Sequence, residues 1–394
     1  MMICPGCYKE VKKGYCLSCR KKLFNGQNIP TILPFETPKD KNLKEFQSKT
    51  KKLSISGVQL KYSLRIENKQ LKLSERDGQF ILKPIPPTVE IEKNDQAPEN
   101  EHLTMQIASQ IFGIATAENA LIYFQDGTPA YITRRFDVKA DGTKYQQEDM
   151  AQLSGKTKQS RGEDFKYDGT YEEVGKLIRK YAAAALPSLE NFFKILVFNY
   201  IFSNGDAHLK NFSLVQTDMK DYALSKAYDL MSTAIHTPDE GQTALDLYDN
   251  YTDSEFYAIY GVYGQHAFSE LAKRLGIPKQ RAERILTQML SSRDKVRDLI
   301  SRSFLSKEAK EIYVNNYERR LEFMGLTPAL IMAIVDPDQK GLPNDKAVEL
   351  IFPRAKRLKG RFIESLPNNK YRFESSDHIQ TTIDGDQLYA INRS

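Results

Sequence analysis

The 394-residue sequence has no apolar stretch long enough to cross a membrane. The longest one, Phe192–Phe202, is interrupted by Lys194 and Asn199 and is far shorter than the roughly 20 residues that a membrane-spanning helix requires. The sequence also has no internal repeat and no low-complexity tract. With 40% hydrophobic and 27% charged residues, it has the composition of a folded protein, which excludes the collagen-like, disordered and membrane-spanning classes.

Cysteine is scarce as well, because the chain has only four, and all of them lie in the first 19 residues. A secreted protein stabilised by disulfides would spread its cysteines through the fold. The first residues also lack the positive region and the apolar region of a signal peptide. We therefore expect a reducing, cytoplasmic location and no membrane partner.

The four cysteines form two C-x2-C pairs separated by eight residues, which is a spacing typical of a tetrahedral thiolate site. A piece of roughly 25 residues cannot fold on apolar burial alone, so a metal would supply the folding energy. We predict structural Zn²⁺ in a zinc-ribbon-like module over residues 1–25; an iron centre and a redox dithiol remain alternatives. The predicted ligands are Cys4, Cys7, Cys16 and Cys19.

The positive charge of the chain is concentrated near its start. Residues 1–61 hold 13 Lys/Arg and 4 Asp/Glu, a net charge of +9, whereas the whole chain has a net charge of +6. A basic segment with a metal site leaves direct nucleic-acid binding open as an alternative function. Aromatic residues are not interleaved with the lysines in a base-stacking pattern, which argues against it.

The rest of the chain divides into a β-rich part and a helical part. Alternating apolar residues predict hairpins over 59–73 and 120–136, with a helix over 101–112 between them. Residues 26–50 and 84–100 are punctuated by prolines and predict a linker and a loop. Helical periodicity predicts helices over 171–184, 189–203, 265–274, 278–291, 293–302 and 306–324. The extension 326–394 is partly strand-like.

A dense polar loop, residues 204–213, directly follows the nearly all-apolar helix predicted over 189–203. Within this loop, Asp206 and Asn211 have the Asp-x4-Asn spacing of a kinase catalytic loop, in which the aspartate orients the acceptor hydroxyl and the asparagine holds Mg²⁺. Asp229 follows an aromatic residue about twenty positions later and is the candidate second metal ligand. The loop therefore predicts phosphoryl transfer.

Two residues of the β-rich part complete this pattern. Lys83 ends a predicted strand, where a phosphate-binding lysine belongs, and Glu101 opens the next helix, where its ion-pair partner belongs. Each signal has an ordinary structural explanation by itself: an Asp-x4-Asn pair is common, and His208 alone would more often be a packed histidine. The order of all the parts along the chain is what favours a phosphotransferase.

The chain resembles the HipA family of serine/threonine kinases, the toxins of bacterial toxin–antitoxin pairs. The resemblance covers roughly residues 50–325 and implies an α+β, bilobal, protein-kinase-like fold, with a β-rich N-lobe over 51–140 and a helical C-lobe over 141–325. It rests on Ser56-Gly57-Val58-Gln59-Leu60-Lys61, Phe80–Pro84, Asn100-Glu101, Arg135-Phe136-Asp137, Gln147–Met150, Asn204–Ser213 and Tyr228–Thr233.

The resemblance implies a role for each matching residue. Asp206 would be the catalytic aspartate, supported by His208 and Lys210, and ATP and Mg²⁺ would be the cofactors. Asn211 and Asp229 would hold Mg²⁺. The nucleotide would be bound by Lys83, Glu101, the loop residues Ser56, Gly57, Val58 and Gln59, and the hinge residues Arg135, Phe136 and Asp137. Family members also phosphorylate a serine of the glycine-containing loop, for which Ser54 and Ser56 are the candidates.

The resemblance further implies a growth-inhibiting toxin that phosphorylates a translation-related protein of the aminoacyl-tRNA synthetase class. Its partner would be a helix-turn-helix antitoxin, and DNA would be contacted only through that antitoxin. Longer family members have a β-rich subdomain where this chain has about 50 residues and the cysteines. We therefore expect a split variant, whose missing subdomain is a separate small polypeptide. A small-molecule kinase is the alternative enzyme, and a catalytically inactive scaffold is disfavoured because no expected residue is missing.

Overall fold

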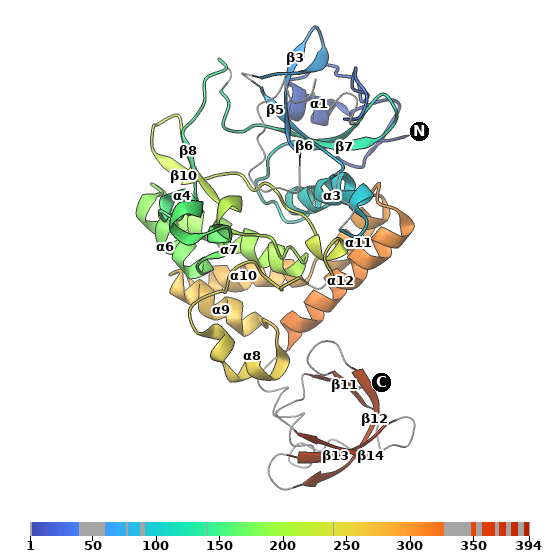
Figure 1. Ribbon diagram of the computed structural model, residues 1–394, viewed down its shortest axis with the longest axis vertical. Helices are drawn as coiled ribbons and strands as arrows, with labels where there is room; N and C mark the ends of the chain where they lie inside the picture. Colours follow the sequence, from blue (N-terminus) through green and yellow to red (C-terminus); the bar gives the residue numbers. More distant parts are fainter. Residues whose placement is uncertain are drawn as a thin grey trace. The chain divides into compact units, whose positions relative to one another are not determined.

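The computed structural model describes residues 2–38, 60–75, 78–86, 91–139, 141–238 and 240–326, together with five strands of the C-terminal extension (Figure 1). The chain divides into two compact units, one of residues 1–245 with 275–320 and the other of residues 246–274 with 321–394. Among the described residues, no helix is both long enough and apolar enough to cross a membrane.

The N-lobe of the first unit is built on a five-stranded antiparallel sheet with the order β4-β3-β5-β7-β6. Both hairpins lie where the alternating residues predict them. Asn68 and Lys69 have positive φ angles of 49° and 60°, the backbone of a tight two-residue turn whose twist matches that of its strands. The strands are β3 (Tyr62–Glu67), β4 (Gln70–Leu73), β5 (Phe80–Pro84), β6 (Asn119–Tyr123) and β7 (Pro129–Arg134).

One long helix, α3 (Ala97–Gln110), packs across β6 and β7. It follows a short 3₁₀ turn, η1 (Asn94–Gln96), and begins four residues before the predicted start, so the prediction of a loop up to residue 100 is wrong at its end. Pro98 explains the difference, because a proline is well tolerated in the first turn of a helix, where its missing N–H would have no partner. Residues 97–108 are almost entirely buried, which fixes Glu101 inside the lobe.

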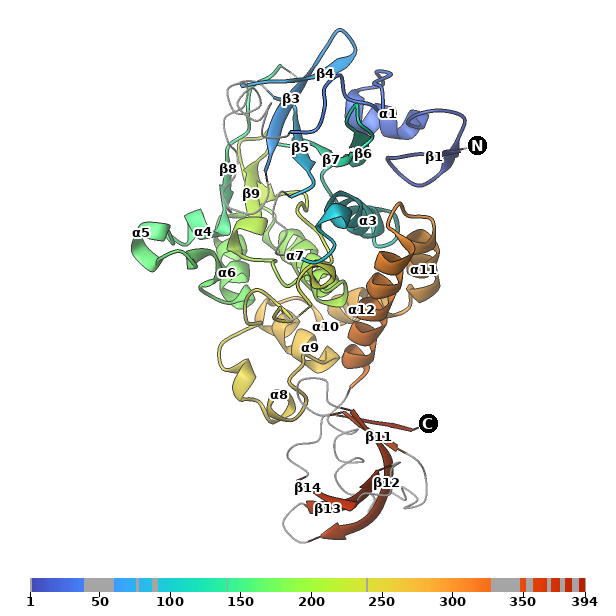
Figure 2. The same ribbon diagram turned by 45° about the vertical axis from the view of Figure 1, so that its right-hand side comes forward.

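The cysteine segment is not a separate domain but packs on the N-lobe sheet. It consists of β1 (Met2–Ile3), β2 (Glu10–Val11) and α1 (Leu17–Phe24), and its buried residues share one apolar core with the sheet. The described part of the predicted linker continues this packing, since Leu33 N–H donates to the Tyr123 carbonyl at 2.7 Å and Tyr123 N–H donates to Thr31. Residues 26–38 thus lie against β6, and residues 39–50 lie outside the described residues. Figure 2 shows α1 beside the sheet.

The C-lobe part of the first unit is mainly helical, as the periodicity predicts. The second half of α7 (Ala185–Ile201) is buried on all sides from Ile195 onward because its sequence is nearly all apolar, whereas Pro187 and Asn191 in its first half are exposed. Beside it lies a small sheet, absent from the sequence prediction, of β8 (Gln147–Asp149), β9 (Ser213–Gln216) and β10 (Tyr222–Leu224). The other helices are α4 (Met150–Leu153), α5 (Lys158–Arg161), α6 (Tyr171–Tyr181), α10 (Lys279–Leu290), α11 (Arg293–Ser301) and α12 (Lys307–Gly325), with 3₁₀ turns η2 (Phe165–Tyr167), η3 (Leu209–Asn211) and η4 (Thr233–Ile235).

The second unit combines two helices with a sheet. η5 (Tyr251–Asp253), α8 (Glu255–Tyr260) and α9 (Gln265–Arg274) form its helical part, in which Phe256, Tyr260 and Val262 pack with Phe323 and Leu326. The C-terminal extension forms an antiparallel sheet with the order β14-β13-β12-β11-β15, which confirms its strand-like sequence. The strands are β11 (Val348–Ile351), β12 (Arg357–Leu366), β13 (Lys370–Ser375), β14 (Gln380–Asp384) and β15 (Ala390–Arg393).

Candidate active site

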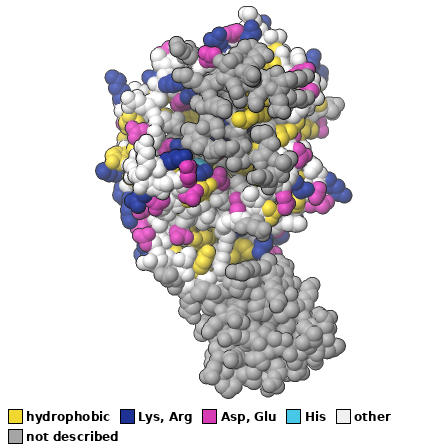
Figure 3. Space-filling model, in the orientation of Figure 1, with side chains coloured by type: hydrophobic (Ala, Val, Ile, Leu, Met, Phe, Trp, Pro, Cys, Tyr) yellow, Lys and Arg dark blue, Asp and Glu magenta, His cyan; other side chains and the backbone are white. Residues whose placement is uncertain are grey.

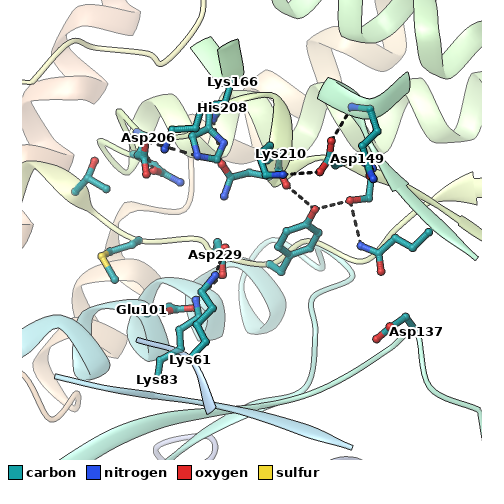
Figure 4. A pocket seen from close by; sticks show the side chains of 18 residues that line it. Lys61, Lys83, Glu101, Asp137, Asp149, Lys166, Asp206, His208, Lys210 and Asp229 are labelled. Atoms are coloured by element: carbon teal, nitrogen blue, oxygen red, sulfur yellow. Dashed lines mark hydrogen bonds and ion pairs between the residues drawn. The ribbon is translucent and has the colours of Figure 1, made fainter. Parts of the chain in front are cut away.

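A cavity of about 430 Å³ in the first unit collects most of the residues predicted to carry the chemistry (Figure 4). They arrive from different elements: β5, α3, the 204–213 loop and the segment after β10. The predicted site residues that line the cavity are Lys83, Glu101, Asp137, Asp206, His208, Lys210, Asn211 and Asp229. Ser54, Ser56, Gly57, Val58 and Gln59 lie outside the described residues.

Lys83 forms a buried ion-paired cluster with two carboxylates. Its side chain is only 3% exposed, and its Nζ lies 2.5 Å from Glu101 Oε1 and is also paired with Asp229 Oδ1. The second carboxylate oxygen of Asp229 lies 3.3 Å from Lys61 Nζ. Asp229 has a positive φ of 55°, a conformation that is uncommon for residues other than glycine and that Asn and Asp adopt more often than the rest. The backbone is therefore held in an uncommon shape where it presents this carboxylate to the lysines.

The charges of this cluster support one another. Burial alone would lower the pKa of Lys83, but the carboxylates of Asp229 and Glu101 outweigh it and raise that pKa, so the ammonium stays charged. Burial would likewise raise the pKa of Asp229, and Lys61 and Lys83 together hold it well below its usual range. Glu101 has a raised pKa because its burial outweighs the attraction of Lys83. The Lys83 ammonium is therefore held, charged and buried, between the side chains of Glu101 and Asp229.

The 204–213 loop begins where α7 ends. Ser203 has a positive φ of 52° and reverses the chain, after which Gly205 N–H donates to Thr233 Oγ1 at 2.7 Å. A Cβ atom on Gly205 would come within 2.6 Å of both Glu240 Cδ and the Gly241 carbonyl oxygen, so only glycine fits there. The loop is thereby pinned at its start, and Asp206 follows directly.

Within the loop, Asp206 and Asn211 play different structural parts. Asp206 points outward with a side chain that is 48% exposed, and its Oδ1 accepts a hydrogen bond of 2.5 Å from the Tyr167 hydroxyl. Asn211 closes the turn η3, because its Oδ1 accepts from His208 N–H at 3.2 Å. His208 Nε2 is 3.9 Å from Asp206 Oδ1, and burial lowers the pKa of His208 despite the nearby Asp206.

Lys210 is paired with Asp149, a residue of the Gln147–Met150 motif to which the sequence assigned no role. Its Nζ lies 3.1 Å from Asp149 Oδ2, while Asp149 Oδ1 accepts from Gln152 N–H and caps α4. The Tyr228 hydroxyl donates to the Lys210 carbonyl at 2.9 Å. Asp149 thus fixes the lysine beside the cavity. Only the pairing of β8 with β9 brings the two residues together, so the sequence pattern could not indicate it.

The predicted hinge residues differ in their positions. Asp137 lines the cavity, and Arg135 Nε donates to Asp137 Oδ1 at 2.9 Å. Phe136 instead packs its ring against that of Tyr228, with the ring centroids 5.8 Å apart. Of these three residues only Asp137 belongs to the lining; Arg135 is paired with its carboxylate, and Phe136 packs against another lining residue, Tyr228.

Asn100, the neighbour of Glu101 in the motif, uses its side-chain amide to bind the backbone of Ser232. It is fully buried and bonds both backbone groups of Ser232: its Nδ2 donates to the carbonyl at 2.9 Å and its Oδ1 accepts from the N–H at 3.1 Å. The segment that carries Asp229 is therefore fastened to α3, next to Glu101. These two bonds couple the helix to the candidate metal ligand.

The donor sets fit the metals that the sequence predicts. An amide oxygen from Asn211 and a carboxylate from Asp229 line one cavity, and such oxygen ligands suit Mg²⁺. The Sγ atoms of Cys4, Cys7, Cys16 and Cys19 all lie within 4.8 Å of one another. Four sulfurs about 2.3 Å from a tetrahedral zinc lie roughly 3.8 Å apart, and Cys7 Sγ is 3.6 Å from Cys16 Sγ. The thiols therefore have the spacing of a closed structural site.

The fold and the site together define a kinase-like protein with a β-rich lobe and a helical lobe around one polar cavity. A family model described as the HipA-like C-terminal domain matches residues 53–296, and the chain belongs to this family.

Two curated relatives are named "Putative kinase", from Haemophilus influenzae, and "Putative kinase Y4dM", from Sinorhizobium fredii. The first is 26% identical over 331 residues, which cover 80% of this chain and 94% of the relative. The second is 30% identical over 246 residues, which cover 56% of this chain and 57% of the relative.

Among solved structures, the chain is similar to Shewanella oneidensis HipA in a complex with HipB and operator DNA. The TM-score is 0.51 at 20% identity, covering 74% of this chain and 71% of that one. At this identity the likeness shows the fold: an α+β, bilobal, kinase-like architecture, as predicted.

Proposed function

We propose that this chain is an ATP-dependent protein serine/threonine kinase of HipA type. The observation that carries the proposal is the buried Lys83–Glu101 pair, joined to Asp229 in one cavity with Asp206 and Asn211. A phosphate-binding lysine held by an acid on the adjacent helix is what phosphoryl transfer requires, because charge develops on the transferred group.

Each residue then has a defined part. Lys83 contacts the α/β-phosphates and stays charged in its buried position. Asp206 orients a serine or threonine hydroxyl for in-line attack, and its exposed carboxylate is reachable from solvent. Asn211 and Asp229 hold Mg²⁺, which neutralises the phosphate oxygens when it is bound. His208 and Lys210 shape the loop and the phosphate side of the cavity, with Lys210 oriented by Asp149.

The finer parts of the proposal follow from family membership. They comprise a growth-inhibiting toxin, a translation-related protein substrate, a helix-turn-helix antitoxin that alone contacts DNA, and a separate small polypeptide as a further partner. Self-phosphorylation is assigned to Ser54 or Ser56 and structural Zn²⁺ to the four cysteines. The HipA of Shewanella oneidensis, solved with HipB and operator DNA, supports an antitoxin partner. We place the protein in the cytoplasm.

The test is a change at the proposed catalytic aspartate. Asp206→Asn keeps the size of the side chain but removes the carboxylate that orients the acceptor, so phosphoryl transfer should fall by at least about 100-fold. The measurement is the amount of phosphate incorporated at Ser54 or Ser56, determined by peptide mass spectrometry after incubation with Mg²⁺ and ATP. Asp141→Asn is the control, since Asp141 is exposed and accepts hydrogen bonds from the neighbouring Thr143 in a turn. Equal phosphate in wild type and Asp206→Asn contradicts the proposal.

A second prediction concerns the start of the loop. Gly205→Ala should lower phosphoryl transfer by about 100-fold, because the Cβ displaces the loop from Glu240 and Gly241 and carries Asp206 with it. ATP affinity should change much less, since Lys83 lies on another element. Gly325→Ala, at the end of α12 with open space around it, is the matched control. Unchanged turnover of Gly205→Ala would show that the loop tolerates the shift.

Two other functions are outcomes of the same measurements. Phosphate transferred to a panel of small hydroxyl compounds, and not to protein, would favour a small-molecule kinase. On the described surface seen in Figure 3, cationic and anionic side chains are interspersed. A salt-dependent gel shift with the purified chain would nevertheless favour direct nucleic-acid binding through the basic N-terminal segment.

A further inference from the structure

The proposed catalytic carboxylate already holds a hydroxyl group of this chain. The Tyr167 hydroxyl donates to Asp206 Oδ1 at 2.5 Å, a length typical of a strong O–H···O⁻ bond. Burial and this hydrogen bond raise the pKa of Tyr167, so the phenol keeps its proton and remains the donor. Among the described residues, no other hydroxyl is bonded to Asp206.

The tyrosine is held in place by its surroundings. Its ring meets the His208 ring edge-on at 5.4 Å, and the Lys166 ammonium lies 4.7 Å from the ring centroid. The turn η2, which carries it, is fastened by Lys156, whose Nζ donates to the Asp168 carbonyl and pairs with Glu173 Oε2 at 3.5 Å. Placing the hydroxyl on Asp206 is therefore a feature of the folded loop.

The position matters because of what a kinase aspartate does. An acceptor hydroxyl has to come within hydrogen-bond reach of this carboxylate before transfer. Figure 4 shows Asp206 at the opposite side of the cavity from Lys83, where an acceptor would meet a bound nucleotide. Tyr167 is not among the residues that line the cavity, so it reaches the carboxylate from outside the nucleotide space.

We infer that Tyr167 occupies the place of the acceptor hydroxyl on Asp206 and sets acceptor affinity by competing for that carboxylate. This inference rests on the proposed kinase function. A protein acceptor has to displace the phenol. The free energy that the acceptor gains on binding Asp206 therefore has to exceed that of the hydrogen bond from Tyr167. The same contact occupies Asp206 Oδ1 against water, which slows the hydrolysis of ATP between encounters with an acceptor.

The inference predicts what happens when the hydroxyl is removed. Tyr167→Phe keeps the ring against His208 but leaves Asp206 Oδ1 open to water. That water donates its proton to Asp206 while its oxygen forms a bond to the γ-phosphorus and the bond to ADP breaks, giving ADP and phosphate. If Tyr167 instead served only to position Asp206, its loss would lower turnover with every acceptor.

The experiment uses the full chain with Mg²⁺ and ATP alone and follows ADP release. Tyr167→Phe should hydrolyse ATP about 10-fold faster than wild type, with an unchanged KM for ATP, because only the acceptor side is altered. Equal or slower hydrolysis by Tyr167→Phe overturns the inference, whether or not wild-type hydrolysis is measurable.

Two controls separate this outcome from others. Tyr181→Phe is a matched variant, since Tyr181 is 41% exposed against 38% for Tyr167 and has Lys180 over its ring at 4.8 Å. It should hydrolyse ATP as wild type does. Adding Asp206→Asn to Tyr167→Phe should remove the gain, and a gain that survives overturns the inference. If the wild-type protein does not bind ATP at all, that result contradicts the proposed kinase function and not the role of Tyr167.

Discussion

Methionine in place of Lys83 is expected to abolish ATP binding and to lower the free energy of unfolding by about 3–5 kcal/mol, as removal of one partner of a buried ion pair does. The side chain is nearly as long but loses the ammonium, the one cation that is paired with Glu101 among the described residues; the Glu101 side chain is 1% exposed. Asp229 keeps Lys61 as a partner at 3.3 Å. The carboxylate of Glu101 is the group left without compensation.

This assignment also fixes the pH dependence. The pKa of Glu101 is already raised by burial in the wild type, and loss of Lys83 removes the main attraction that lowers it. A carboxyl whose folded pKa lies above its unfolded value adds stability below the unfolded value and loses it as the pH rises through the folded value. The Lys83→Met variant should therefore recover part of its stability in mild acid. Urea unfolding between pH 5 and pH 8 measures this.

Matched variants show which charge is responsible. Lys61→Met removes a cation that is 24% exposed and that, among the described residues, is paired with Asp229, so it should cost much less stability than Lys83→Met. Lys83→Met combined with Glu101→Gln should regain stability at neutral pH without regaining ATP binding. A Lys83→Met protein that is as stable as wild type and binds ATP in calorimetry would refute the role given to this cluster.

Much of the site could be predicted because its signals are local in sequence. The apolar run of α7 followed by the polar 204–213 loop marks one wall of the cavity, and Lys83 at the end of β5 and Glu101 in the next helix mark the other. Both hairpins and the main helices follow from periodicity of two or 3.6 residues. The early start of α3 was missed because Pro98 was interpreted as a loop signal.

The contacts that orient the site could not be predicted in this way. Asp149 in β8 meets Lys210 in η3, which lies 61 residues away in sequence. Tyr167 meets Asp206 from a short turn with no periodic pattern. Asn100 and Ser232 are 132 residues apart. Such pairs depend on how elements pack in three dimensions, whereas spacing along the chain reports only neighbours on one helix or strand.

The cysteine segment is the other feature whose placement the sequence did not reveal. Its backbone is bonded to the N-lobe, because Leu121 N–H donates to the Pro5 carbonyl at 2.9 Å and Gln110 Nε2, at the end of α3, donates to the Cys7 carbonyl at 3.2 Å. The Tyr8 ring lies 5.0 Å from that of His102, the residue next to Glu101 in α3. The cysteines therefore brace the helix that carries the partner of Lys83.

Removal of the proposed Zn²⁺ should consequently weaken the binding of nucleotide. Chelation, or Cys16→Ser, removes the proposed Zn²⁺, whose binding contributes about 10–16 kcal/mol to the folding of small zinc modules, and leaves residues 1–25 held by the core they share with the sheet. We expect faster amide exchange along α3, a loss of several kcal/mol of stability and ATP affinity about 10-fold weaker, as α3 loosens and Glu101 with it.

The measurements are metal content, hydrogen exchange by mass spectrometry and ATP calorimetry on the same samples. Tyr15→Phe removes one hydroxyl bond, of 2.7 Å to the Leu121 carbonyl, and leaves all four sulfurs in place, so it should retain the metal and change α3 exchange only slightly. If the metal-free protein keeps the exchange protection of α3 and its ATP affinity, the thiolate site does not stabilise α3. If both are lost together, the thiolate site acts through α3, because that helix joins the cysteines to the buried ion pair.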